Sequence, residues 1–186
     1  TGGSSSGAGV SLSQGSAVVA MGTDTGGSVR IPASVTGNVG LKTTIGRWSV
    51  EGIVPLSHTY DTPGPLTRNV TDAILAFGAI DPAHRNAEAF FQQTDGAEVG
   101  NFNFAVCDEH FWEDCGPGID EGVRQAIAEL SAKGARIGSV SLPEATLARE
   151  SSLRGGIFGA EGQSFIEEHY PDRMDTLDPN VAERFA

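Results

Sequence analysis

Two short clusters of glycine and serine constrain this chain more than any other feature of its sequence. The first reads Gly2-Gly-Ser-Ser-Ser-Gly7, and the second reads Gly22-Thr-Asp-Thr-Gly-Gly-Ser-Val-Arg30. Glycine adopts backbone angles that other residues avoid, and it lets the chain approach a ligand closely. The short apolar stretch at residues 15–21 predicts a buried strand that enters the second cluster. The sequence therefore predicts a site whose key groups belong to the backbone of loops.

The charge of the chain disfavours some partners. The 186 residues are 39% hydrophobic, which is enough for one domain or part of one. Twelve basic residues against 24 acidic ones give a net charge of -12, which would repel a phosphate backbone. We therefore expect no nucleic-acid partner and favour a neutral or cationic small molecule as substrate. No apolar run is long enough to cross a membrane and no signal peptide is visible, so we expect no membrane partner and a cytoplasmic location.

The two cysteines do not indicate a metal site or a disulfide framework. Cys107 and Cys115 are the only cysteines, and their spacing matches no common zinc pattern. We expect both to be free thiols. The four histidines are scattered along the chain without mutual spacing, so the sequence predicts no metal and no cofactor.

Regular hydrophobic periodicity begins at Val70 and predicts an α/β fold. Residues 144–186 predict helical segments, broken near Gly155-Gly156 and near Pro171. Before them, a strand, a helix and a strand follow one another at the spacing of a right-handed crossover on a mostly parallel or mixed sheet. The predicted elements are a helix at 71–80, a strand at 102–107, a helix at 119–133 and a strand at 135–142.

Several known loop motifs fit the glycine clusters poorly. The first cluster matches G-x-S-x-G, but a nucleophile elbow requires a preceding strand, and only three residues precede Ser4. Neither cluster has the Gly-Lys-Ser/Thr of a phosphate loop or a clean G-x-G-x-x-G. Asp24-Thr25-Gly26 is similar to an aspartic protease loop, which needs two carboxylates. Because the motif occurs once, that interpretation requires a symmetric homodimer, which stays open as an alternative.

Taken together, the clusters and the residues after them closely resemble the amidase signature family. The agreement is dense over residues 2–72 and looser from there to about residue 150. We take residues 1–186 as one partial amidase domain, with residues 1–72 as its signature core and residues 73–186 as an α/β continuation. The matching motifs are GGSSSG at 2–7, GTDTGGSVRIPA at 22–33, Gly37-x-x-Gly-Leu-Lys-Thr43, Gly46-Arg-x-Ser49, Gly52-Ile-Val-Pro55 and Asp61-Thr-Pro-Gly-Pro-Leu-Thr-Arg68.

The resemblance implies a mixed β-sheet covered by helices and an amide hydrolase with a Ser, cis-Ser, Lys triad. Ser28 matches the nucleophile, and Ser4, after a cis Gly3–Ser4 bond, matches the bridging serine. The backbone N–H groups of Thr25, Gly26, Gly27 and Ser28 match an oxyanion hole, which stabilises the charge that develops on the carbonyl oxygen. Water then hydrolyses the acyl-enzyme.

Further residues match supporting positions of the family. Ser5, Asp24 and Arg30 correspond to residues that hold the catalytic loops by hydrogen bonds and ion pairing. For Asp61, Arg68 and Asp72 we favour helix caps and buried pairs over a catalytic role.

The catalytic lysine of the family belongs to a segment upstream of GGSSSG. The chain has only two lysines, Lys42 and Lys133, and we assign the proton-accepting role to neither. We therefore expect the chain to be a fragment of an amidase that is inactive alone. Two alternatives stay open: a glutamine-hydrolysing subunit of a tRNA-dependent amidotransferase, and a truncated amidase fold without catalysis.

Overall fold

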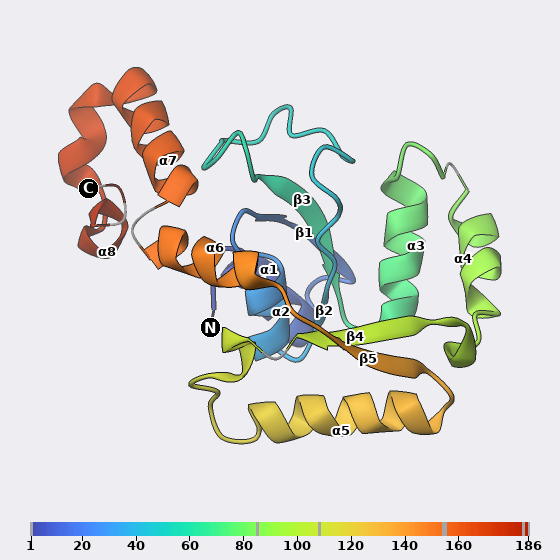
Figure 1. Cartoon of the computed structure of the whole chain (residues 1–186). Coiled ribbons are helices and arrows are strands. Elements are labelled where there is room, and N and C mark those ends of the chain that lie inside the picture. Colours follow the sequence, from blue (N-terminus) through green and yellow to red (C-terminus); the bar gives the residue numbers. More distant parts are fainter. Residues whose placement is uncertain (1, 85, 108, 154–155, 184, 186) are drawn as a thin grey trace. The chain divides into compact units, whose positions relative to one another are not determined.

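The computed structural model describes residues 2–84, 86–107, 109–153, 156–183 and 185. Its helices and strands form two compact units. The first unit comprises residues 1–95 and 155–186, and the second unit comprises residues 96–154. Figure 1 follows the chain through both. The expected α/β character is confirmed, and each unit is described by itself.

The first unit is built on a three-stranded antiparallel sheet. Its strands are β1 (Val19–Asp24), β2 (Val39–Gly40) and β3 (Thr62–Thr67), in the spatial order β1-β3-β2. The register places Val19 of β1 opposite Thr67 and Asp24 opposite Thr62. The strand predicted at 15–21 is therefore present with shifted bounds, and its predicted burial is wrong. The strand begins at Val19, and most of its residues are exposed or half-buried because only one face packs on the core.

The central strand β3 is fully buried although it contains Pro63 and Pro65, which have no N–H to donate. The carbonyl of Pro65 accepts the N–H of Leu41 at 3.0 Å, and that of Pro63 accepts the hydroxyl of Thr43 at 3.1 Å. Both prolines thus turn their backbone toward β2, which is only two residues long. The missing N–H groups of the two prolines therefore do not interrupt the backbone hydrogen bonds between β3 and β1.

Two short helices cover this sheet and form the core with it. These are α1 (Ser6–Ser13) and α2 (Arg30–Val35). Leu12, Val29, Ala33 and Leu66 make the buried cluster. No sequence pattern indicated α1, because its small residues show no amphipathic repeat. Their size has a structural reason, since a Cβ on Gly9 would lie 2.8 Å from the Thr36 hydroxyl oxygen beside α2.

The predicted helix at 71–80 is confirmed as α3 (Val70–Ile80), which packs against α4 (Ala87–Asp95) (Figure 1). The side chain of Asn69 caps α3 by accepting the N–H of Asp72 at 2.8 Å. The unit ends with α7 (Gly156–His169), the 3₁₀ helix η3 (Pro171–Thr176) and α8 (Pro179–Ala182). The predicted break near Pro171 is confirmed, whereas Gly155 of the other predicted break lies outside the described residues.

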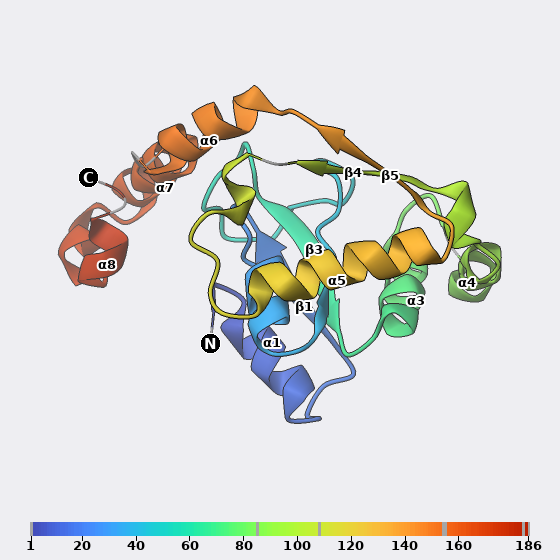
Figure 2. The same cartoon turned by 60° about the horizontal axis from the view of Figure 1, so that its bottom comes forward.

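The second unit is the predicted crossover. Strands β4 (Asn103–Cys107) and β5 (Arg136–Val140) pair in parallel, and α5 (Ile119–Ala132) joins them and lies along the pair (Figure 2). The remaining elements are η1 (Val99–Asn101), η2 (His110–Trp112) and α6 (Pro143–Leu153). Cys107 and Cys115 are free thiols, as expected.

Candidate active site

The two glycine and serine clusters meet at one cavity of the first unit. The peptide bond between Gly3 and Ser4 is cis. The N–H of Ser5 donates a hydrogen bond of 3.1 Å to the carbonyl of Ser28, which joins the two loops directly. The cavity has a volume of about 560 Å³, and the cluster residues that line it are Gly3, Ser4, Thr25, Gly26 and Ser28.

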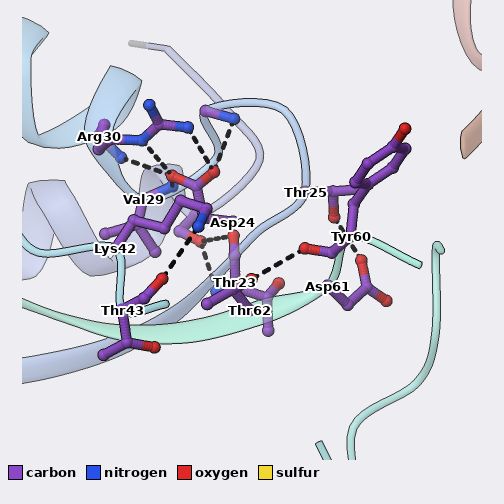
Figure 3. A network of polar contacts seen from close by, with 12 residues as sticks. Thr23, Asp24, Thr25, Val29, Arg30, Lys42, Thr43, Tyr60, Asp61 and Thr62 are labelled. Carbon is purple, nitrogen blue, oxygen red and sulfur yellow. Dashed lines mark hydrogen bonds and ion pairs between the residues drawn. The ribbon is translucent and has the colours of Figure 1, made fainter. Parts of the chain in front are cut away.

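Asp24 organises the second cluster from the end of β1. Its carboxylate is fully buried. It accepts the N–H groups of Gly27 at 2.8 Å, Val29 at 3.2 Å and Arg30 at 3.3 Å. The guanidinium of Arg30 adds two hydrogen bonds of 3.0 and 2.9 Å, so five donors converge on one carboxylate (Figure 3). This arrangement folds the loop tightly around Asp24 and starts α2.

The contacts of Asp24 determine its ionisation. Burial raises the pKa of Asp24, but the hydrogen bonds from the Arg30 side chain and from the three N–H groups outweigh it, so the net pKa lies below the ordinary 3.8. The partner responds in the opposite direction, since hydrogen bonding to Asp24 raises the pKa of Arg30. Both groups are therefore charged at neutral pH. The structure places Asp24 and Arg30 as supports of the loop, outside the lining of the cavity.

The geometry reduces the predicted set of oxyanion donors. The N–H of Gly27 points to Asp24 Oδ1 and is not available to a substrate. The residue has a φ of 125°, and an added Cβ would lie 2.7 Å from Ile31 Cδ1, so only glycine fits there. Among the described residues, the backbone hydrogen bonds outside helices and strands do not use the N–H groups of Thr25, Gly26 and Ser28. These three residues of the predicted set also line the cavity.

Ser5 supports the loops from the start of α1. Its hydroxyl oxygen accepts the N–H of Thr23 at 3.3 Å and lies 3.4 Å from the carbonyl of the same residue. An added Cβ on Gly22 would lie 2.5 Å from this oxygen, which explains the glycine at that position of β1. Ser5 therefore ties the cis-bonded segment to the strand that carries Asp24.

The cavity is also lined by apolar residues to which the sequence analysis assigned no role. Phe158 of α7, Val181 of α8 and Phe185 line it, together with Ile31 and Leu56. Glu161 of α7 accepts the hydroxyls of Ser57 and Thr59, the latter at 2.6 Å, and the N–H of Thr59 at 3.2 Å. Residues 144–186 carry no motif, so a glutamate there could not be told from an ordinary exposed helix charge.

Asp61, Arg68 and Asp72 lie in different surroundings and do not form one cluster. Asp61 is buried and accepts hydrogen bonds from Thr25, Leu56 and Ser57. Asp72 belongs to the N-terminal cap of α3. Arg68 is exposed and so forms no buried pair. The expectation of caps and buried contacts thus holds for the two aspartates only.

Neither lysine lines the cavity. The ammonium of Lys42 donates to the carbonyl of Thr43 at 2.9 Å, and Lys133 is the C-terminal cap of α5 in the second unit. In the described part of the chain, no group of three His, Cys, Asp or Glu side chains could bind a metal ion. Among the same residues, no helix has both the length and the apolar character needed to cross a membrane.

Comparison with known proteins identifies relatives of this site. The chain is 47% identical over 184 residues to 2-amino-5-chloromuconic acid deaminase of Comamonas testosteroni, covering 98% of this chain and 39% of the relative. It is 37% identical over 151 residues to a glutamyl-tRNA(Gln) amidotransferase subunit of Akkermansia muciniphila, covering 77% of this chain and 32% of the relative. The chain thus spans about two fifths or less of the length of these relatives.

The fold and the family agree with these relatives. The X-ray structure of native peptide amidase from Stenotrophomonas maltophilia superposes with a TM-score of 0.70 at 28% identity, over 98% of this chain and 41% of that one. The sequence model of the amidase family matches residues 1–183. The chain therefore belongs to the amidase signature family.

Proposed function

We propose that this chain carries the nucleophile and the oxyanion hole of an enzyme that hydrolyses small amides. One observation carries the proposal: Ser4, which follows a cis bond, and Ser28 line one cavity together with Thr25 and Gly26, and no backbone hydrogen bond among the described residues outside helices and strands uses the N–H groups of residues 25, 26 and 28. The apolar side chains of Leu56, Phe158 and Phe185 also line the cavity. An amide with an apolar acyl group fits such a surface.

In the proposed reaction, Ser28 Oγ attacks the amide carbonyl and its proton passes through the Ser4 hydroxyl to a base. The family resemblance implies that this base is a lysine, and neither Lys42 nor Lys133 occupies that position. The carbonyl oxygen becomes an oxyanion and accepts the N–H groups of Thr25, Gly26 and Ser28. The C–N bond then breaks, the proton returns to the leaving nitrogen, and ammonia or an amine departs. Water releases the acid and regenerates Ser28.

Fluorophosphonate labelling of the complete gene product, including any residues encoded before Thr1, tests the proposal. A fluorophosphonate phosphorylates an activated serine and loses fluoride, and peptide mass spectrometry then locates the adduct. We expect the adduct on Ser28 and its loss in Ser28→Ala. The exposed Ser16 provides the control, because Ser16→Ala removes a hydroxyl from the same unit without touching the cavity. A folded complete product that carries no adduct on Ser28 would overturn the proposal.

A glutamine-hydrolysing amidotransferase subunit is the second candidate. Its support is the 37% identity to a subunit of this kind over 77% of the chain. Ammonia release from glutamine by the complete gene product, increased by further subunits, would favour it. Hydrolysis of other small amides without glutaminase activity would favour the stand-alone amidase, and the net charge of -12 agrees with that outcome because it disfavours contact with tRNA.

A further inference from the structure

Asp61 lies opposite Thr25 at the point where β1 and β3 separate. In the antiparallel register Thr23 pairs with Pro63 and Asp24 pairs with Thr62, so the next opposed pair along the ladder is Thr25 and Asp61. Neither residue belongs to a strand. The pairing therefore continues for one step beyond the sheet, at the first residue of the oxyanion loop.

Thr25 and Asp61 contact each other through their side chains. The Thr25 hydroxyl donates to Asp61 Oδ1 (Figure 3), while Asp61 Oδ2 accepts the N–H groups of Leu56 at 2.8 Å and Ser57 at 3.0 Å. Asp61 is only 9% exposed. A buried carboxylate with three donors is fixed in orientation, because losing any of them would leave a charge poorly solvated. Thr25 is thereby attached to a second, independent segment of the chain.

The oxyanion loop is consequently held on two sides. Successive side chains along an extended chain point to opposite faces, so Asp24 and Thr25 reach different surroundings. Asp24 holds Gly27, which lies between the donors Gly26 and Ser28, and also Val29 and Arg30, which follow the last donor. Asp61 holds Thr25, which is itself the first donor. Of these two carboxylates, only Asp61 therefore holds a residue that is itself one of the proposed donors.

We propose that Asp61 is a positioning residue, which orients the N–H of Thr25 toward the oxyanion through the Thr25 hydroxyl. The inference rests on the proposed function, because it assigns a role within the same acyl-transfer site. Asp61 is not among the residues that line the cavity, so the proposed role is exerted through Thr25. Its effect is on the rate of the chemical step, since a donor that is misplaced by a fraction of an ångström stabilises the oxyanion less.

The chain offers a matched control in Glu161. Like Asp61, which accepts the N–H groups of Leu56 and Ser57, Glu161 is a carboxylate that holds the same loop, through Ser57 and Thr59. Unlike Asp61, it has no contact with Thr25. If the carboxylates serve only to tie down this loop, Asp61→Asn and Glu161→Gln should have similar effects on catalysis. If Asp61 positions Thr25, only Asp61→Asn should slow the chemical step.

The experiment measures fluorophosphonate labelling of Ser28 in the complete gene product as a function of probe concentration. This separates the limiting labelling rate from the half-saturating concentration. We expect Asp61→Asn and Thr25→Val to lower the limiting rate by about 10- to 100-fold with little change in half-saturation. Thr25→Ser keeps the hydroxyl and should restore the rate. The Thr25→Val/Asp61→Asn double variant should be no slower than either single variant.

Each remaining outcome decides the question. A wild-type rate in folded Asp61→Asn, or equal slowing by Glu161→Gln, would overturn the positioning role while the proposed function stands. If Asp61→Asn does not fold, a wild-type rate in Thr25→Val would overturn the role in the same way. A folded wild-type protein without any label on Ser28 would instead refute the proposed function, and the role of Asp61 would fall with it.

Discussion

The two compact units of this chain differ in how much of their side chains they bury. The second unit is a regular crossover, in which α5 joins the parallel strands β4 and β5, and Ala135 is the one buried residue among its described side chains. The first unit has short strands and glycine-rich loops, yet it buries Leu12, Val29 and Leu66 together with charged Asp24. The candidate site thus lies in the unit that has the larger buried core.

The difference follows from what the proposed oxyanion site requires. Regular helices and strands use their backbone N–H groups in their own hydrogen bonds, so few remain for a ligand. A loop can leave such donors unused only if other groups hold its shape. In the first unit, the carboxylates of Asp24 and Asp61 supply this hold. Buried polar groups are therefore the cost of an irregular but fixed backbone.

The largest expected effect tests whether the chemistry belongs to the first unit alone. Ser28→Ala should lower the turnover of a small amide by about 10⁶-fold, because it removes the nucleophile. Cys107→Ala removes a nucleophilic atom from the apolar cavity of the second unit and should leave turnover unchanged. Ammonia release from the complete gene product is the measurement. Loss of activity in Cys107→Ala would break the comparison.

The next effect concerns stability. Leu66 is fully buried on β3, so Leu66→Ala should lower the free energy of unfolding by about 2–5 kcal/mol. Val123 on α5 is 47% exposed, and Val123→Ala should change it by no more than about 0.5 kcal/mol. Urea unfolding followed by circular dichroism compares the two. Equal losses would show that the second unit has a core of similar density.

The third prediction concerns how Asp24 makes the stability of the first unit depend on pH. The folded-state pKa of Asp24 lies below 3.8, so its contribution to stability is present above that pH and disappears as the pH falls through the lowered pKa. Asp24→Asn should lower stability at pH 7 by about 1.5–3 kcal/mol, since it weakens charge-assisted hydrogen bonds. The difference between variant and wild type should shrink toward acid. Thermal melting between pH 7 and pH 2 measures it, and a constant difference would contradict the assignment.

The smallest effect is expected in the second unit. Glu109 accepts the Cys107 thiol, the Ser141 hydroxyl and the N–H of Leu142, and these contacts lower its pKa from 4.5 to about 2 against the effect of burial. Its stabilising contribution is therefore present above pH 4.5 and is lost as the pH falls toward about 2.

Glu109→Gln should flatten the acid dependence of the second unit over this range. The exposed Glu150 on α6 gives the control, because Glu150→Gln removes the same charge without these contacts. Amide hydrogen exchange of β4 and β5 resolves the unit from the rest. Identical profiles for the two variants would show that the Glu109 contacts do not stabilise the unit.

The sequence predicted the regular elements and the candidate site by different means. Hydrophobic periodicity was sufficient for α3, β4, α5 and β5, because each follows a simple repeat with recognisable ends. It failed for α1 and for the start of β1, where small residues pack closely and no repeat is visible. Motifs, by contrast, identified residues 4 and 28, which the structure brings to one cavity.

Long-range contacts are what the sequence could not supply. Glu161 holds Ser57 across more than a hundred positions, and nothing near either residue signals the pairing. The use of the Gly27 N–H by Asp24 was hidden although the two residues are only three positions apart, because it depends on how the loop turns back on itself. Such contacts follow from the folded backbone rather than from local spacing.

The prolines of β3 also favour one register in the pairing of β3 with β1. Pro63 and Pro65 turn their donor-free side toward β2, which leaves the N–H groups of the alternate residues for β1. Sliding β3 by one position would present the prolines to β1 and break that pairing. It would also move Asp61 away from Thr25. The two prolines that disfavour a shifted pairing of β3 with β1 therefore also keep Asp61 beside Thr25.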